Sequence, residues 1–419
     1  MKLVVAGTGY VGLVTAVCLA ERGHDVTCVD IDEKKVLLMA GGTSPIYEPE
    51  LDVLMKKNSP HLHFTTNYAK AYKDAEAIFI GVGTPEQEDG TANLTFVRTV
   101  AKQIAESIER DCVVVVKSTV PLGTNDEVEK YIRENLTHKV IVHVASNPEF
   151  LSQGRAVEDT LHAKRIIIGV EDKVAENVLL NVYQPFGLPI VVTNRRSAEM
   201  IKYACNDFLA LKISYINEIA NLCEKVGASI DDVVKGMSYD DRIGSKFLHP
   251  GIGYGGSCFP KDTKALYFMA KNNFGVEMRT VKAAIDVNTS QRTRLFYDAR
   301  NAFGSFDEKT VAVLGLTFKP DTDDIREAPS KEMVSLLLKD GAVVNVYDPI
   351  GEGNFKRIHP NDVNYFLTPE SAIEKADIVF VLTEWKQIKE CDYKGKVVFD
   401  GRNCVLSHSD AKFYKSIGR

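Results

Sequence analysis

Short apolar runs alternate with amphipathic segments at both ends of the chain, and this pattern predicts an α/β fold. In the first half, the apolar runs have the length and β-branched content of strands buried on both faces, and helix-like segments separate them. Strand–helix alternation of this kind predicts a parallel sheet. The main predicted strands of the first half are residues 2–6, 25–30, 75–80, 112–116 and 140–144.

The middle of the chain has a different period. After residues 190–193, apolar side chains recur at helical spacing up to Gly227, which predicts one helix of roughly 30 residues with Ser197 as its N-cap. A helix of this length can link two domains and supply a dimer interface, or it can be the core helix of one domain. The residues that set its period are Ile201, Phe208, Leu211, Tyr215, Leu222 and Val226.

From residue 310 the strand–helix alternation returns and repeats the order of the first half. Residues 310–315 match the first predicted strand, 344–348 the second and 376–382 the third. Because 419 residues exceed what one core normally holds, we expect two Rossmann-like domains joined by a central helical segment with one long helix. The expected boundaries are 1–195 for a dinucleotide-binding domain, 196–300 for the helical, dimerisation and catalytic-loop region, and 301–419 for the second Rossmann-like domain.

Three glycines follow the first strand in the spacing of a dinucleotide-binding turn. Gly7 makes the turn, Gly9 lets the backbone reach a pyrophosphate, and Gly12 lets the following helix pack close to its strand. The second strand ends in Asp30, whose carboxylate can accept hydrogen bonds from ribose hydroxyls and would repel a 2′-phosphate. This favours NAD over NADP, although the lysines at positions 34 and 35 leave the preference open.

Polar residues also follow three later strands at their carboxyl ends, where ligands bind in doubly wound sheets. They are Thr84, Thr119 and Glu149, which elsewhere would be ordinary turn or cap residues. On the long helix, Lys202 and Asn206 lie one turn apart. They are either a solvated surface pair or a partly buried pair beside a ligand.

Cys258 follows four glycines and precedes two opposite charges, Lys261 and Asp262. Glycine allows close approach of a ligand, and a nearby cation favours the reactive thiolate, so we expect a nucleophile. A buried structural cysteine and a glycine-rich phosphate loop are the alternatives. The turn after residue 315 carries Lys319 and Arg326, which indicates either a second phosphorylated ligand or a degenerate copy of the first fold.

Charge and hydropathy exclude several classes of protein. A net charge of −6 argues against nucleic-acid or anionic-membrane binding, and no apolar run approaches the roughly 20 residues of a membrane span. The chain enters its first strand without a secretory signal, so we expect a cytoplasmic location. The other seven cysteines are scattered singly, which predicts free thiols and no metal site.

Together these motifs resemble those of the UDP-glucose 6-dehydrogenase family, one of the nucleotide-sugar dehydrogenases, over almost the whole chain. The matching segments are Gly7-Thr-Gly-Tyr-Val-Gly12, Lys117-Ser-Thr119, Asn147-Pro-Glu-Phe150, Lys202 with Asn206, Phe247-Leu248, Gly255-Gly-Ser-Cys-Phe-Pro-Lys-Asp262, Phe318-Lys-Pro-Asp-Thr322 and Asp400-Gly-Arg402.

The resemblance implies oxidation of a sugar CH2OH to a carboxylate with two NAD per turnover, as in UDP-glucose to UDP-glucuronate. A first hydride transfer gives an aldehyde, which Cys258 attacks. The thiohemiacetal gives up a second hydride and becomes a thioester, and water hydrolyses the thioester to the acid. The resemblance further implies that residues 301–419 bind the nucleotide sugar. We also expect a homodimer, joined through the long helix.

The same resemblance assigns roles to individual residues. Lys202 and Asn206 would stabilise an oxyanion, Asp262 with Thr119 would position a water, and Glu149 would assist proton transfer. The residues expected to bind NAD are Gly7, Gly9, Tyr10, Val11, Gly12, Asp30, Lys35, Thr84, Thr119, Gln153, Lys261 and Arg326. Those expected to bind the nucleotide sugar are Glu149, Phe150, Leu151, Ser152, Gln153, Lys202, Asn206, Phe247, Leu248, His249, Pro250, Gly251, Gly255, Lys319 and Arg402.

One position departs from the family pattern. Where many relatives carry a second acid, this chain has Gln153, which can form hydrogen bonds but cannot act as a base. The role of that acid therefore does not carry over. Three alternatives remain: another nucleotide sugar such as UDP-N-acetylmannosamine, a two-electron β-hydroxyacid dehydrogenase, and an NAD-dependent sensor or partner-binding protein. The last two would have no use for Cys258.

Overall fold

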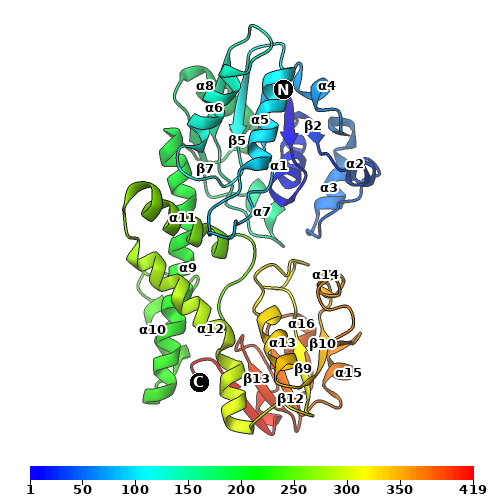
Figure 1. Cartoon of the computed structure of the whole chain (residues 1–419), viewed down its shortest axis with the longest axis vertical. Helices are drawn as coiled ribbons and strands as arrows, with labels where there is room; N and C mark the ends of the chain where they lie inside the picture. Colours follow the sequence, from blue (N-terminus) through cyan, green and yellow to red (C-terminus); the bar gives the residue numbers. More distant parts are fainter. The chain divides into compact units, whose positions relative to one another are not determined.

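The computed structural model describes every residue from Met1 to Arg419. The chain divides into two units, Met1–Cys205 and Asn206–Arg419, and each is built on its own sheet with helices around it (Figure 1). This confirms the predicted fold class of two Rossmann-like α/β domains with a long central helix.

The sheet of the first unit has eight strands in the order β3-β2-β1-β4-β5-β6-β7-β8. All neighbours pair in parallel except β6 and β7, which are antiparallel. The first six strands have the order of a dinucleotide-binding fold, with a switch point between β1 and β4. The strands are β1 Lys2–Ala6, β2 Asp25–Val29, β3 Leu62–Thr65, β4 Ala77–Ile80, β5 Cys112–Val116, β6 Val142–Ser146, β7 Ile166–Gly169 and β8 Ile190–Thr193.

Helices cover both faces of this sheet, which explains the continuous apolar runs in the sequence. Along β1, Leu3 and Val5 join one hydrophobic cluster, whereas Val4 and Ala6 join another. The helices are α1 Tyr10–Glu21, α2 Glu33–Ala40, α3 Leu51–Lys57, α4 Tyr68–Tyr72, α5 Thr95–Ser107, α6 Thr124–Glu134, α7 Ala156–Leu161 and α8 Lys173–Tyr183.

The long helix α9 spans Arg195–Val226, 32 residues, and runs from the first unit into the second. It begins two residues before the predicted N-cap. The side chain of Asn194 accepts a hydrogen bond from the backbone N–H of Ser197 at 2.7 Å. Asn194 is therefore the cap, and the prediction of Ser197 was wrong because Ser197 occupies the third helical position, whose N–H needs a cap.

The second unit has a six-stranded, fully parallel sheet in the order β11-β10-β9-β12-β13-β14. This is the same order as the first six strands of the other unit, so the internal repeat seen in the sequence is a repeat of topology. The strands are β9 Thr310–Leu314, β10 Val343–Tyr347, β11 Asn364–Tyr365, β12 Ile378–Val381, β13 Val397–Asp400 and β14 Phe413–Ser416. The helices are α10 Ile230–Ser238, α11 Phe259–Phe274, α12 Arg279–Phe303, α13 Pro329–Lys339, α14 Glu352–Phe355, α15 Pro369–Ile373 and α16 Lys386–Glu390.

The second unit repeats the glycine turn that follows the first strand, but the acid after its second strand is not available to a ligand. Gly315 follows β9 with φ +92°, as Gly7 follows β1 with φ +93°. Asp348 follows β10, but its carboxylate accepts the backbone N–H of Leu316 at 2.7 Å and the indole N–H of Trp385 at 3.1 Å. Asp348 is only 2% exposed. Its carboxylate therefore stabilises the loop after β9 and cannot bind a ribose as Asp30 can.

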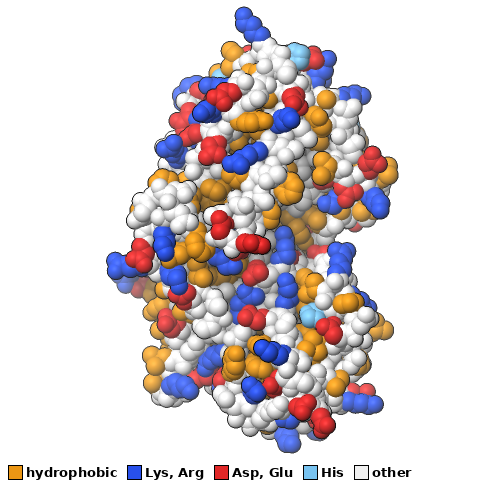
Figure 2. All heavy atoms as spheres, in the orientation of Figure 1, with side chains coloured by type: hydrophobic (Ala, Val, Ile, Leu, Met, Phe, Trp, Pro, Cys, Tyr) orange, Lys and Arg blue, Asp and Glu red, His pale blue; other side chains and the backbone are white.

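Basic and acidic side chains are interspersed on the face drawn in Figure 2. None of the helices combines the length and the apolar character that a membrane span requires.

Candidate active site

The glycine turn of the first unit has the geometry that its sequence predicts. Gly7 lies in the left-handed region, which favours glycine. A Cβ on Gly12 would stand 1.9 Å from the carbonyl oxygen of Gly7, so only glycine lets α1 begin this close to the turn. A Cβ on Gly9 would meet nothing within 4 Å. The open space beside Gly9 is where a pyrophosphate could approach the start of α1 at Tyr10 and Val11.

Asp30 lies at the carboxyl end of β2 and is held in place by this turn. One carboxylate oxygen accepts the backbone N–H of Thr8 at 3.0 Å and also its hydroxyl, and the other accepts the N–H of Asp32 at 3.0 Å. Partial burial raises the pKa of Asp30, but these hydrogen bonds, with help from the charge of Lys35, outweigh it and lower the pKa. Asp30 is therefore an anion at neutral pH, which favours NAD over a 2′-phosphorylated cofactor.

The loops after β4 and β5 are tied to each other. The Thr84 hydroxyl donates to the backbone carbonyl of Thr119 at 2.8 Å, and the Ser118 hydroxyl donates to that of Val82 at 2.6 Å. Both predicted threonines thus lie at the carboxyl ends of adjacent strands of the sheet.

Glu149 and Lys202 form a buried ion pair in the first unit. Their side chains are 5% and 3% exposed, and Lys202 Nζ lies 2.9 Å from Glu149 Oε1. The other carboxylate oxygen accepts the backbone N–H of Leu151 at 2.7 Å, and Lys202 Nζ also lies 5.4 Å from the ring centre of Phe150. Lys202 is therefore no solvated surface lysine. It is a buried cation beside the segment predicted to hold substrate.

Two residues that stabilise the segment containing Glu149 and Gln153 were not among the predicted site residues. Lys117 donates to the side-chain oxygen of Asn147 at 3.0 Å, and burial lowers its pKa to about 8. Glu48 accepts the backbone N–H groups of Gly154 and Ala156 at 2.7 and 2.6 Å, which fixes the loop of Gln153. Lys117 could have been found from its place in the Lys-Ser-Thr motif, whereas Glu48 has no local sequence signal.

In the second unit, Cys258 is the N-cap residue of α11. Its side chain makes no capping hydrogen bond, and the residue is neither fully buried nor fully exposed. A helix N-terminus favours a negative charge, so this position stabilises a thiolate. By contrast, burial raises the pKa of the thiols of Cys18, Cys112 and Cys391 to about 12. Those three thiols are inert at neutral pH.

Asp262 lies one turn into α11, where it joins two other predicted site residues. Its oxygens accept a hydrogen bond from Asn206 Nδ2 at 2.7 Å and one from Lys261 Nζ at 2.6 Å. Asp262 is 1% exposed, so the amide and the cation replace the water that its charge would otherwise need. The structure thus brings together residues from α9 and α11 that are far apart in the sequence.

The glycines before Cys258 pack against the protein itself. A Cβ on Gly255 would stand 2.2 Å from the carbonyl oxygen of Glu327, and one on Gly256 would stand 2.8 Å from the ring of Phe318. The sequence alone suggests that glycines here make room for a ligand. The structure gives them a different task, which is to seat the Cys258 loop against the turn after β9.

The loops around this segment carry strained backbone. Phe247, Asp321, Glu327 and Asn403 have φ between +50° and +63°, a region that non-glycine residues rarely adopt. Strain of this kind clusters at functional sites because the surrounding structure must enforce it. Phe247 is a predicted substrate residue, Asp321 lies in the same turn as Lys319, and Asn403 directly follows Arg402.

Arg402 joins these segments. Its guanidinium donates to the backbone carbonyls of Phe318 at 3.0 Å, Leu382 at 2.9 Å and Gly253 at 3.4 Å. The His249 ring lies 2.9 Å from the Arg402 carbonyl oxygen. In the same segment, the Gly251 N–H donates to Asn217, and Leu248 and Pro250 are buried. The structure therefore gives Arg402 a role in holding together the segments that were predicted to bind the nucleotide sugar.

The two remaining basic residues predicted from the turn after β9 have different surroundings. Lys319 Nζ lies 5.7 Å from the ring centre of Phe318. Arg326 makes a two-point hydrogen bond to Asp324, with its Nη2 at 2.6 Å, and its side chain is 60% exposed. Lys319 therefore lies at the Cys258 loop, and Arg326 presents a charge to solvent.

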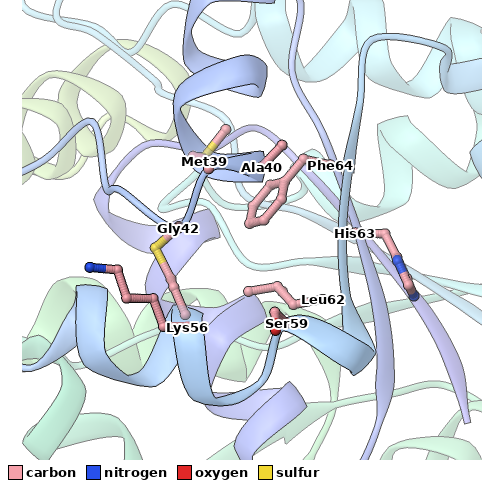
Figure 3. A pocket seen from close by; sticks show the side chains of 10 residues that line it. Met39, Ala40, Gly42, Lys56, Ser59, Leu62, His63 and Phe64 are labelled. Atoms are coloured by element: carbon pink, nitrogen blue, oxygen red, sulfur yellow. The ribbon is translucent and has the colours of Figure 1, made fainter.

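One pocket of the first unit is lined by none of the predicted site residues (Figure 3). It has a volume of about 440 Å³ and lies between the end of α2 and the amino end of β3. Ligands of doubly wound sheets bind at the opposite, carboxyl ends of the strands. Its lining residues are Met39, Ala40, Gly41, Gly42, Met55, Lys56, Ser59, Leu62, His63 and Phe64.

Comparison with known proteins agrees with this arrangement. Residues 1–187 match the NAD binding domain of the UDP-glucose/GDP-mannose dehydrogenase family, residues 196–290 its central domain and residues 312–407 its UDP binding domain. UDP-glucose 6-dehydrogenase YwqF of Bacillus subtilis is 50% identical over 100% of this chain and 98% of its own length.

Solved structures give the same result. A UDP-glucose dehydrogenase from Pyrobaculum islandicum superposes with a TM-score of 0.96 at 39% identity, over 99% of this chain and 96% of its own. A UDP-N-acetylmannosamine dehydrogenase, Cap5O of Staphylococcus aureus, superposes with a TM-score of 0.83 at 26% identity, over 100% and 98%. The chain belongs to the UDP-glucose/GDP-mannose dehydrogenase family.

Proposed function

We propose that this protein oxidises UDP-glucose to UDP-glucuronate, using two NAD per turnover and a covalent intermediate on Cys258. The observation that carries the proposal is the placement of Cys258 at the start of α11, one turn before an Asp262 carboxylate held by Asn206 and Lys261. A nucleophile and a base on successive turns of one helix suit formation and hydrolysis of a thioester. The eight free thiols favour the reducing cytoplasm.

Each group has a chemical task in this proposal. The glycine turn and Asp30 would hold NAD, which would supply the acceptor for a hydride from the sugar carbon. The Cys258 thiolate attacks the resulting aldehyde to give a thiohemiacetal, and a second NAD, exchanged for the first NADH, would accept the hydride whose loss converts the thiohemiacetal into a thioester. Lys202 and Asn206 stabilise negative charge on the reacting oxygen.

Proton transfer uses the remaining carboxylates. Asp262, with Thr119, positions a water molecule and accepts its proton as the thioester is hydrolysed, and Glu149 assists. Gln153 cannot act as a base. The proton route is therefore assigned to Asp262 and Glu149 alone.

UDP-glucose is proposed as the substrate because relatives such as YwqF, at 50% identity, and the Rhizobium meliloti enzyme, at 44%, carry that name. Family members named for UDP-N-acetylmannosamine share the fold but are less similar in sequence, 26% for Cap5O against 50% for YwqF. The test compares initial rates of NADH formation with the two sugars at equal concentrations. We expect UDP-glucose to react at least about tenfold faster, and a preference for UDP-N-acetylmannosamine would contradict the assignment.

We also propose that the protein is a homodimer joined through α9. Four of the apolar side chains that are exposed on this helix follow one another at intervals of 7, 7 and 4 residues: Phe208 at 62%, Tyr215 at 50%, Leu222 at 57% and Val226 at 66%. This spacing places them along one stripe, which a second copy of the helix could cover. Light scattering should give twice the monomer mass, and a monomeric mass would refute the dimer.

A further inference from the structure

Glu199 is a buried glutamate on α9 that the proposed mechanism does not use. It is 3% exposed, and its carboxylate accepts three hydrogen bonds from the start of α6. One oxygen accepts the backbone N–H of Gly123 at 2.7 Å, and the other accepts the backbone N–H of Asn125 at 3.0 Å and its side-chain Nδ2 at 2.6 Å. Burial raises the pKa of Glu199, and these hydrogen bonds oppose the shift.

The start of α6 needs an acceptor from elsewhere in the chain. Its N-cap residue is Gly123, which has no side chain to accept the free N–H groups of the first turn. The Glu199 carboxylate takes that place. The rest of α6 is held by ion pairs with another residue of α9, because Arg195 lies 2.8 Å from Asp126 and 2.6 Å from Glu129. Loss of the Glu199 carboxylate should therefore loosen the first turn of α6 without detaching the helix.

The segment between β5 and α6 carries Thr119 and is fixed at both ends. At the strand end, the Thr84 hydroxyl donates to the Thr119 carbonyl at 2.8 Å. At the helix end, four residues after Thr119, the N–H of Gly123 donates to Glu199 at 2.7 Å. Without the second attachment, the segment would be held to the sheet at one end only.

Glu199 also lies one turn before Lys202 on α9. Residues three positions apart are neighbours on a helix surface, so both side chains extend from one side of α9. Lys202 Nζ lies 2.9 Å from Glu149, in the segment after β6. Successive turns of α9 therefore bind the two strand-end segments that carry Thr119 and Glu149. This arrangement lies entirely within the first unit.

We propose that Glu199 is a positioning residue, which caps α6 from α9 and thereby holds Thr119 in a fixed place relative to Lys202 and Glu149. The inference rests on the proposed function only for the role of Thr119 in positioning the hydrolytic water. In that step water adds to the thioester carbonyl, the C–S bond breaks and Cys258 leaves as the thiolate. A loosely held Thr119 would position the water less often, so this step would slow. A purely stabilising Glu199 would leave its rate unchanged.

The experiment uses Glu199→Gln, with Glu127→Gln as the matched control. Glutamine has the size of glutamate but only one acceptor oxygen, and its NH2 group would face an N–H of α6. Glu127 also lies in the first turn of α6, but its side chain is 67% exposed and lies 3.9 Å from Arg98. The control therefore removes a charge at the same helix end and leaves the buried cap intact. Asn125→Ala, which removes one of the three hydrogen bonds, takes the same measurements if Glu199→Gln does not fold.

The first measurement is hydrogen–deuterium exchange of the backbone amides of residues 118–126, without substrate. In Glu199→Gln the amides at the start of α6 should exchange at least about tenfold faster than in wild type, because the first turn opens more often. Glu127→Gln should exchange as wild type does. Exchange unchanged in Glu199→Gln would overturn the inference, since the segment would then be held without Glu199.

The second measurement is turnover of UDP-glucose at saturating NAD. We expect Glu199→Gln to lower kcat roughly tenfold or more without raising KM, and Glu127→Gln to follow wild type. After an acid quench during turnover, mass spectrometry should find a larger fraction of Cys258 carrying the acyl group than in wild type. A wild-type kcat, or a lower kcat without more acyl-enzyme, would overturn the inference.

The two measurements also separate this inference from the proposed function. If wild type forms no NADH with UDP-glucose, the proposed function fails. The exchange rates still decide whether Glu199 holds the segment of Thr119.

Discussion

Replacing Cys258 with serine should leave binding of UDP-glucose and NAD intact while reducing UDP-glucuronate formation by roughly a thousandfold or more. Serine keeps the size of the side chain at the start of α11, but its hydroxyl is a far weaker nucleophile than a thiolate at a helix N-terminus. The variant should form little acid and release aldehyde slowly. Binding is measured by calorimetry, and product by chromatography of UDP-sugars.

Cys112→Ala is a suitable control because it removes a thiol elsewhere in the protein. Cys112 is buried at the amino end of β5, away from the strand ends that bind ligands. We expect this control to retain activity with a modest loss of stability. Acid formation by Cys258→Ser at a rate close to that of wild type would exclude a covalent intermediate on Cys258.

Two glycines of the first turn should respond in opposite ways to alanine. Gly9→Ala should fold with nearly the wild-type melting temperature, because a Cβ there meets nothing within 4 Å. It should nevertheless bind NAD at least about tenfold more weakly, since the methyl group occupies space that a pyrophosphate needs. Gly12→Ala should lose stability by roughly 1–3 kcal/mol or more, because its Cβ would stand 1.9 Å from the Gly7 carbonyl oxygen.

Thermal melting without cofactor and titration with NAD separate these effects. A Gly9→Ala variant with wild-type affinity for NAD would show that the dinucleotide does not approach the turn at Gly9. Unchanged stability of Gly12→Ala would mean that α1 is not seated as closely as the structure shows.

The sequence predicts the two Rossmann-like units because their determinants are local. Strands buried on both faces need continuous apolar residues, as in β5, where all five residues are buried. The glycine spacing after β1 and the acid after β2 are likewise fixed by short-range geometry. These signals give the topology of the first unit and the place of Asp30.

Features that depend on distant packing could not be predicted in the same way. Asn206 is a single amide within a helix, and only the approach of α11, 56 positions later at Asp262, makes it a hydrogen-bond donor to a buried carboxylate. From the sequence alone, the glycines before Cys258 suggest room for a ligand. In the structure, Glu327 and Phe318 pack against them instead. In both cases, the role of the residue depends on burial and on contacts between segments that are far apart in the sequence.

The number of NADH molecules formed per UDP-glucose consumed tests the central claim most directly. With limiting UDP-glucose and excess NAD, the four-electron oxidation predicts two NADH and one UDP-glucuronate for each sugar, without free aldehyde. One NADH per sugar, with the aldehyde released into solution, would contradict oxidation through a thioester on Cys258.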